Sequence, residues 1–232
     1  MCGIVAVTGY KKAVPLLLYG LEKLEYRGYD SAGIAVINAN SKNITCNKAE
    51  GKLKNLISKL KNKNISGTVG IGHTRWATHG KPEVKNAHPH LDSSGQVAVV
   101  QNGIIENFQE LKSKLEKEGI VFNSDTDTEV IPHLIQRELN TLSKLKLENN
   151  GSTLLVAVRN VISDIEGSYA LAVLWAGAPN SLVVARSQAP LIIGLGEGEF
   201  ICASDTPAIG HFTNIILPLE DEEIALLTPL GV

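Results

Sequence analysis

The stretch YALAVLW at residues 169–175 begins a series of six short apolar runs near the end of the sequence. The others are SLVVARS (181–187), PLIIGLG (190–196), EFICASD (199–205), NIILPL (214–219) and EIALLT (223–228). Glycine, proline, asparagine and aspartate separate them, which is typical of short strands joined by turns. Six strands in succession favour antiparallel sheet.

Upstream of this series, helical and strand patterns occur in groups and do not alternate one by one. Apolar spacing predicts helices over 13–24, 53–60, 108–119 and 151–165, with a fifth beginning near Asp127. Strands are expected at 4–7, 33–37, 69–73 and 97–101. This segregation predicts an α+β fold in which sheets pack face to face and helices lie outside them.

The expected start of the fifth helix depends on a capping-box pattern. Thr126 is followed three residues later by Glu129, ahead of the apolar positions Val130, Leu134 and Ile135. The pattern predicts that Asp127 lies at the positively polarised end of this helix.

The composition is that of one large domain or at most two small ones. The chain has 232 residues, of which 44% are hydrophobic and 20% charged. No repeat or linker divides it, so we expect residues 1–232 to form one domain. Because 22 Lys and Arg residues face 24 Asp and Glu residues, the net charge of −2 indicates no attraction to nucleic acid or anionic membranes.

Cysteine usage indicates the compartment. Three cysteines, at positions 2, 46 and 202, are too few for a disulfide framework and favour a reducing environment. The N-terminus has no basic segment before its short apolar run, and no later run approaches membrane-spanning length. We therefore expect a cytoplasmic protein.

Cys2 is a candidate nucleophile if Met1 is removed, because it would then carry a free α-amine. Such an amine titrates near ~7.7 to 8.0 and a lysine near ~10.4, so only the terminal amine is substantially neutral at physiological pH. It could accept the thiol proton as the sulfur attacks a carbonyl carbon. The alternative is that Cys2 is a small apolar residue opening a buried strand.

The segment GHTRWATHG at 72–80 is polar, bounded by glycine and placed after a strand. A guanidinium can grip a carboxylate through two parallel hydrogen bonds, so Arg75 suits the α-carboxylate of an amino acid. Thr78 and His79 can add single hydrogen bonds. A structural ion pair of Arg75 is the alternative.

Asn102 and Gly103 place a side-chain amide beside an unhindered backbone N–H, directly after the expected strand 97–101. Such a pair suits an oxyanion hole for a tetrahedral intermediate. The alternative is an ordinary Asn-Gly turn.

Acidic residues follow in SDTDTE at 124–129. Asp127 could bind an α-ammonium group, and Asp125 and Glu129 are rivals for that role. Helix capping explains these acids equally well.

Four histidines, at positions 73, 79, 88 and 90, invite a zinc interpretation. No metal-ligand spacing repeats among them, so we expect neither a metal nor another cofactor.

Seven segments together resemble the glutaminase domains of the glutamine:fructose-6-phosphate aminotransferases, also called glucosamine-6-phosphate synthases, a family of class II glutamine amidotransferases. They are MCGIV (1–5), LEYRGYDSAGIAV (24–36), GHTRWATHG (72–80), NAHPH (86–90), QNGIIENF (101–108), TDTEVI (126–131) and APLIIGLGEGEFICASD (189–205). The resemblance covers essentially the whole chain. It implies the N-terminal nucleophile hydrolase fold, a four-layer αββα sandwich of two mainly antiparallel sheets, and hydrolysis of L-glutamine to glutamate and ammonia.

The resemblance also implies roles for individual residues. Cys2 matches the nucleophile, which would form a thioester, and Arg27 a residue near it. Trp76 matches the residue that gates the ammonia channel. The remaining matches are oxyanion donors at Asn102 and Gly103, and glutamine-binding groups at Arg75, Thr78, His79 and Asp127.

Two departures from the family pattern qualify these expectations. Gln101 stands where many members have histidine, and it can hydrogen-bond but cannot titrate. The sugar-phosphate isomerase region is absent from these 232 residues. In the family that region binds fructose 6-phosphate, receives ammonia and is expected to make the homodimer.

Two other functions stay open. One is an N-terminal nucleophile hydrolase acting on another amide. The other is a non-catalytic glutamine-binding module, which retention of Met1 would favour because it places the Cys2 nitrogen in a peptide bond.

Overall fold

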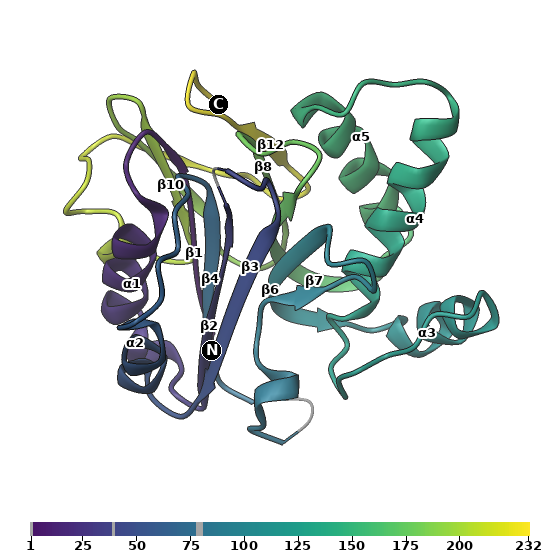
Figure 1. The fold of residues 1–232 in the computed structure, drawn as a ribbon, viewed down its shortest axis with the longest axis horizontal. Helices are drawn as coiled ribbons and strands as arrows, with labels where there is room; N and C mark the ends of the chain where they lie inside the picture. Colours follow the sequence, from purple (N-terminus) through teal and green to yellow (C-terminus); the bar gives the residue numbers. More distant parts are fainter. Residues whose placement is uncertain (1, 39, 78–80) are drawn as a thin grey trace.

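A computed structural model describes residues 2–38, 40–77 and 81–232, and these form two antiparallel sheets (Figure 1). Within this part of the chain, the larger sheet has the strand order β11 (Ile216–Pro218), β9 (Ile192–Leu195), β10 (Glu199–Ala203), β1 (Gly3–Gly9), β4 (Gly70–Arg75), β2 (Ser31–Ile37) and β3 (Ile44–Glu50). The smaller sheet has the order β12 (Ile224–Leu227), β8 (Leu182–Ser187), β7 (Gly167–Trp175), β6 (Val97–Ile105) and β5 (His90–Leu91).

The two sheets pack face to face, and helices cover their outer faces. Side chains of a strand alternate between its two faces, so both faces of β1 are apolar. Ile4 and Ala6 face the core between the sheets, whereas Val5 and Val7 face the core beneath α1 (Ala13–Lys23) and α2 (Leu53–Leu60). On the opposite side α4 (Val130–Lys144) and α5 (Gly151–Ile162) cover β6 and β7 (Figure 1).

These three cores confirm the predicted α+β fold and the order helix, sheet, sheet, helix. The six C-terminal runs all become strands, but they divide between the sheets: β7, β8 and β12 join the smaller, and β9, β10 and β11 join the larger. Helix α3 (Phe108–Lys117) begins at the predicted residue. Strand β3, a polar strand at the edge of the larger sheet, was not predicted.

The predicted start of α4 is wrong. The helix begins at Val130 after an N-cap at Glu129, and no side chain of the described residues caps it. Glu129 instead accepts hydrogen bonds from the backbone N–H groups of Asn123 at 2.8 Å and Ser124 at 2.6 Å. Its carboxylate thus closes the preceding loop, and Asp127 lies in that loop, outside the helix.

Within the described residues, no helix combines the length and the apolar character needed to cross a membrane.

Helix α2 allows a matched test of the packing. Leu56 is fully buried beneath the sheet, whereas the neighbouring Ile57 is 43% exposed. We expect Leu56→Ala to lower the free energy of unfolding by about 2 to 5 kcal/mol, because it leaves a cavity. The control Ile57→Ala should change it by about 0.5 kcal/mol or less. Denaturant unfolding measures both, and equal losses would contradict the orientation of α2.

Candidate active site

The Cys2 thiol lies at the end of β4. Gly3 pairs with Thr74 in the β1–β4 register, which brings Cys2 beside the residues that follow β4. The Trp76 backbone N–H donates a hydrogen bond to the Cys2 Sγ at 3.2 Å. Sheet pairing thus delivers the N-terminal residue to the segment that carries Arg75 and Trp76.

A pocket opens at this thiol and receives residues from both sheets and from the loop before α4. Its lining consists of Cys2, Arg75, Trp76, His88, Gln101, Gly103, Thr126, Asp127 and Thr128. Five of these were predicted from the sequence as site residues. Segments separated by more than 120 positions therefore meet at one place.

The Cys2 thiol stays protonated at neutral pH. Burial raises its pKa, because the surrounding protein disfavours the charged thiolate. The Trp76 N–H and the Arg75 guanidinium act in the opposite direction but do not offset burial. Nucleophilic attack therefore requires a base that removes the proton.

Arg27 holds the backbone of Cys2. Its Nε donates to the Cys2 carbonyl oxygen at 3.1 Å, and its Nη1 lies 2.7 Å from Asp205 Oδ2. The Tyr26 hydroxyl donates to the same Asp205 oxygen at 2.6 Å. This hydrogen bond, followed by the one from the Thr206 backbone N–H and by the charge of Arg27, lowers the pKa of Asp205. Arg27 was expected near the nucleophile, whereas Asp205 was not predicted from the sequence.

Asn102 and Gly103 lie inside β6, so the alternative of an Asn-Gly turn is wrong, as is the expected strand end at 101. Asn102 Nδ2 donates to the Cys2 carbonyl oxygen at 3.0 Å. Gly103 has a φ of +118°, and a Cβ there would approach the Ser168 carbonyl oxygen to 2.1 Å. Close pairing with β7 thus requires glycine at this position.

Arg75 is buried at the end of β4 and lines the pocket. Burial lowers its pKa, although Cys2, Asp30 and Asp127 act against this. Its Nη1 donates to the Lys81 carbonyl oxygen at 3.3 Å. The cation therefore lies beside the thiol and also contacts the far end of its own loop.

Trp76 is 45% exposed and contacts the Tyr29 ring edge-on at 5.4 Å. Thr78 and His79, also predicted to bind substrate, lie outside the residues that the structure describes.

Asp127 is the acid that lines the pocket, and its rivals lie elsewhere. It is buried, and its Oδ2 accepts the Ile105 N–H at 2.8 Å. Asp125 is paired with Lys85 at 2.9 Å near the surface. The Glu129 carboxylate accepts the backbone N–H groups of Asn123 and Ser124 in the loop before α4. Geometry therefore favours Asp127 for contact with a substrate.

Three histidines form a row behind the pocket. The rings of His73 and His88 stack at 4.2 Å, and those of His88 and His90 meet edge-on at 4.7 Å. Burial lowers the pKa of all three, to about 3 for His73, so the rings are neutral. Among the described residues, no group of three or more His, Cys, Asp or Glu is arranged to hold a metal.

Gln101 connects the row of histidines to Thr128, which also lines the pocket. Its backbone N–H donates to His88 Nδ1 at 3.2 Å, and its Oε1 accepts from the Thr128 hydroxyl at 2.7 Å. Sequence analysis did not assign His73, His88 or Thr128 to the site. The motifs GHTRW and NAHPH, with histidines beside the predicted arginine, were the available signal.

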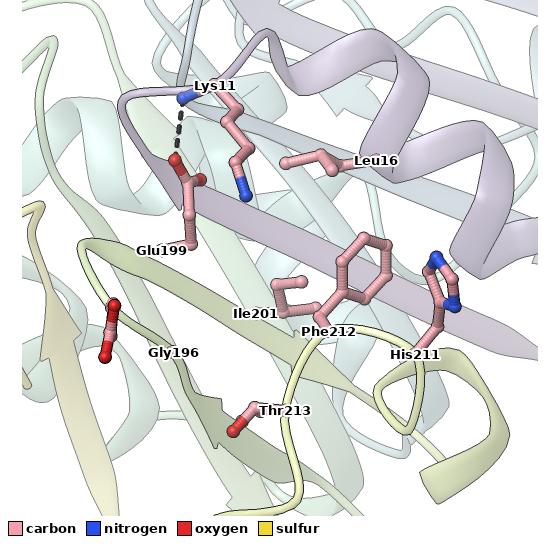
Figure 2. Close-up of a pocket in the computed structure, with 10 residues that line it drawn as sticks. Lys11, Leu16, Gly196, Glu199, Ile201, His211, Phe212 and Thr213 are labelled. Atoms are coloured by element: carbon pink, nitrogen blue, oxygen red, sulfur yellow. Dashed lines mark hydrogen bonds between the residues drawn. The ribbon is translucent and has the colours of Figure 1, made fainter.

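A separate cavity of about 480 Å³ lies between α1, the β9–β10 hairpin and the loop that follows the short helix at Thr206–Ala208 (Figure 2). Lys11, Glu199 and His211 line it, and Glu199 accepts the Lys11 backbone N–H at 2.8 Å. Among the described residues, none of those predicted to be functional lines this cavity, so the pocket at Cys2 is the candidate active site.

Known proteins resemble the chain both in sequence and in fold. A family model described as a glutamine amidotransferase domain matches residues 73–211. Two curated relatives are glutamine–fructose-6-phosphate aminotransferases (isomerizing). The protein of Thermosynechococcus vestitus is 56% identical to this chain and that of Methanosarcina acetivorans is 50% identical, each over 100% of this chain. The chain spans 36% and 37% of the length of these two relatives.

Among solved structures, the glutamine phosphoribosylpyrophosphate amidotransferase of Bacillus subtilis, in complex with ADP and GMP, matches with a TM-score of 0.80 and 28% identity. The match covers 99% of this chain and 48% of that one. A glutamine aminotransferase class-II domain protein of Silicibacter pomeroyi, at 12% identity and a TM-score of 0.60, shares the fold alone. The N-terminal nucleophile hydrolase fold is thereby confirmed. Since the family model covers more than half of the chain, the chain belongs to the glutamine amidotransferase domain family.

Proposed function

We propose that residues 1–232 form one glutaminase domain, which hydrolyses L-glutamine to glutamate and ammonia through a thioester on Cys2. The observation that carries this proposal is the position of the Cys2 thiol, in a pocket lined by Arg75, Gly103 and Asp127. A cation and an acid in the same pocket as a nucleophile suit the carboxylate and ammonium of an α-amino acid. This pairing disfavours hydrolysis of a simple amide without those groups.

The first step is attack by sulfur on the carboxamide carbon of glutamine. With Met1 removed, the Cys2 α-amine accepts the thiol proton as the carbon–sulfur bond forms, and the carbonyl π electrons move to oxygen. The tetrahedral intermediate then collapses and expels ammonia, which takes the proton back from the amine. Water, deprotonated by the same amine, releases glutamate from the thioester and restores the thiol.

Asn102 and Gly103 stabilise the oxyanion of both tetrahedral intermediates. A side-chain amide has two N–H bonds, and the hydrogen bond from Asn102 to the Cys2 carbonyl uses one of them. The second N–H and the Gly103 backbone N–H are the proposed donors. Such donors act where negative charge develops, in a site prepared before the reaction begins.

Substrate recognition rests on charge and on the segment after β4. We assign the α-carboxylate to Arg75 and the α-ammonium to Asp127, with single hydrogen bonds from Thr78 and His79. Trp76 lines the pocket, is 45% exposed and donates its backbone N–H to the Cys2 thiol, which supports its proposed role as the gate for ammonia. The chemistry needs no metal or other cofactor.

The fate of the ammonia is proposed from the relatives. Their names describe an aminotransferase that uses glutamine and fructose 6-phosphate. We infer that this chain supplies ammonia within an enzyme that makes glucosamine 6-phosphate, whose isomerase region binds the sugar phosphate and forms a homodimer. Sparse cysteines support a cytoplasmic location.

Replacement of the nucleophile tests the hydrolysis. Protein whose N-terminal residue is shown by mass spectrometry to be cysteine should release ammonia from glutamine, and Cys2→Ala should abolish the release because no thioester can form. Cys202→Ala is the matched control, since that thiol is buried between the sheets. Continued release by Cys2→Ala, or equal hydrolysis of simple acyl amides by the wild type, would contradict the proposal.

Arg75→Lys tests the carboxylate contact. An ammonium cannot form the two parallel hydrogen bonds of a guanidinium, and a hydrogen bond to a charged group contributes about 1.5 to 3 kcal/mol. We therefore expect the KM for glutamine to rise about ten- to a hundredfold. Arg137→Lys, in an exposed ion pair with Glu118, is the control. An unchanged KM for Arg75→Lys would remove the residue from this role.

The pH profile tests the base. Activity should fall as the pH drops below about 7, because an α-amine with a pKa near 7.7 to 8.0 becomes protonated and cannot accept the thiol proton. His73, His88 and His90 cannot cause this loss, since burial lowers the pKa of each well below its usual value. Steady-state rates from pH 5 to 9 give the profile, and a flat profile down to pH 5 would rule out the amine.

A further inference from the structure

The side chain of Asn102 is held at both ends. At one end its Nδ2 donates to the Cys2 carbonyl oxygen at 3.0 Å. At the other end its Oδ1 lies 3.0 Å from His73 Nε2, which also lies 3.1 Å from the Gln101 carbonyl oxygen. The amide is therefore clamped between the nucleophilic residue and a buried ring.

The partners determine where the His73 proton resides. A backbone carbonyl only accepts hydrogen bonds, so the end of Asn102 that faces Cys2 must be the NH₂ group. Its oxygen consequently faces His73, whose Nε2 then has two acceptors around it and must carry the proton. The Nδ1 atom is left as the unprotonated nitrogen, and it is buried with no hydrogen-bond partner among the described residues.

The ring itself has little freedom. His73 is 1% exposed on β4, and its ring stacks on that of His88 at 4.2 Å and 14°. The pKa of His73 is lowered to about 3, chiefly by burial, so the ring remains a neutral donor throughout the pH range in which the enzyme would act.

We propose that His73 is the positioning residue of the oxyanion hole, and that its Nε2–H keeps the NH₂ group of Asn102 turned toward Cys2 and the reacting carbonyl. If the amide rotated by half a turn, its oxygen would face both the Cys2 carbonyl and the developing oxyanion. The amide of Asn102 would then present an acceptor where the negative charge develops, and only the Gly103 backbone N–H would remain as a proposed donor. His73 acts through Asn102 and does not touch the substrate.

This inference rests on the proposed glutaminase activity and names a further residue that supports it. Two substitutions of His73 distinguish the effect of its N–H donor from the effect of its aromatic ring. His73→Phe keeps an aromatic ring against His88 but removes the N–H, whereas His73→Gln keeps a side-chain N–H at nearly the reach of Nε2. We expect kcat to fall at least about tenfold in His73→Phe, while KM stays within about twofold of the wild-type value. In His73→Gln, kcat should largely recover. For comparison, complete loss of one oxyanion donor lowers kcat about 100- to 1,000-fold.

A double-mutant cycle distinguishes positioning from general structural support. In an Asn102→Ala background there is no amide to orient, so His73→Phe should cause little further loss of kcat. An equal loss in both backgrounds would overturn the proposal, as would an unchanged kcat in the single variant. The pH profile of His73→Gln should match that of the wild type, because His73 does not titrate there.

NMR of the Asn102 side-chain amide gives a readout that needs no activity. Its protons should be protected from solvent exchange in the wild type and in His73→Gln, and should lose that protection in His73→Phe. Unchanged protection in His73→Phe would overturn the proposal. If the wild type releases no ammonia but the amide responds as expected, the glutaminase function fails while the positioning by His73 stands.

Discussion

The carbonyl oxygen of Cys2 accepts two hydrogen bonds, and the site depends on them. Arg27 donates from the side of the larger sheet, and Asn102 donates from β6 of the smaller sheet. A chain terminus ordinarily frays unless it is tied down. These two donors hold the first residues against both sheets, so the thiol has a defined position relative to the groups around it.

The second donor is possible only because the sheets pack face to face. Ile4 and Ala6 on β1 and Val100 on β6 belong to the same core between the sheets. This apolar contact brings the start of β1 next to the middle of β6. Burial of hydrophobic surface thus sets the distance between the nucleophile and its proposed oxyanion donors.

The three histidines and Arg27 avoid an uncompensated buried charge in different ways. The three histidines avoid the cost of a buried charge because burial keeps them unprotonated. Arg27, which is buried, is paired with Asp205, and Asp205 also accepts from Tyr26. Rigid polar contacts of this kind orient reactive groups before a substrate arrives.

The sequence by itself determined the class of fold and the residue types of the site. Alternation and spacing of apolar residues report burial directly, which is why the helices and the six C-terminal strands were predictable. Cys2, Arg75, Asn102, Gly103 and Asp127 could be proposed as site residues because their functional groups suit amide hydrolysis and the binding of an amino acid.

Only the tertiary structure decided which groups meet and how each is oriented. Glu129 closes a loop instead of capping α4, because backbone N–H groups of Asn123 and Ser124 lie within its reach. Asp127 lines the pocket, whereas Asp125 is paired with Lys85 near the surface. The contact between His73 and Asn102 links two different sheets. Local spacing carries no information on such contacts, since they depend on how the layers pack.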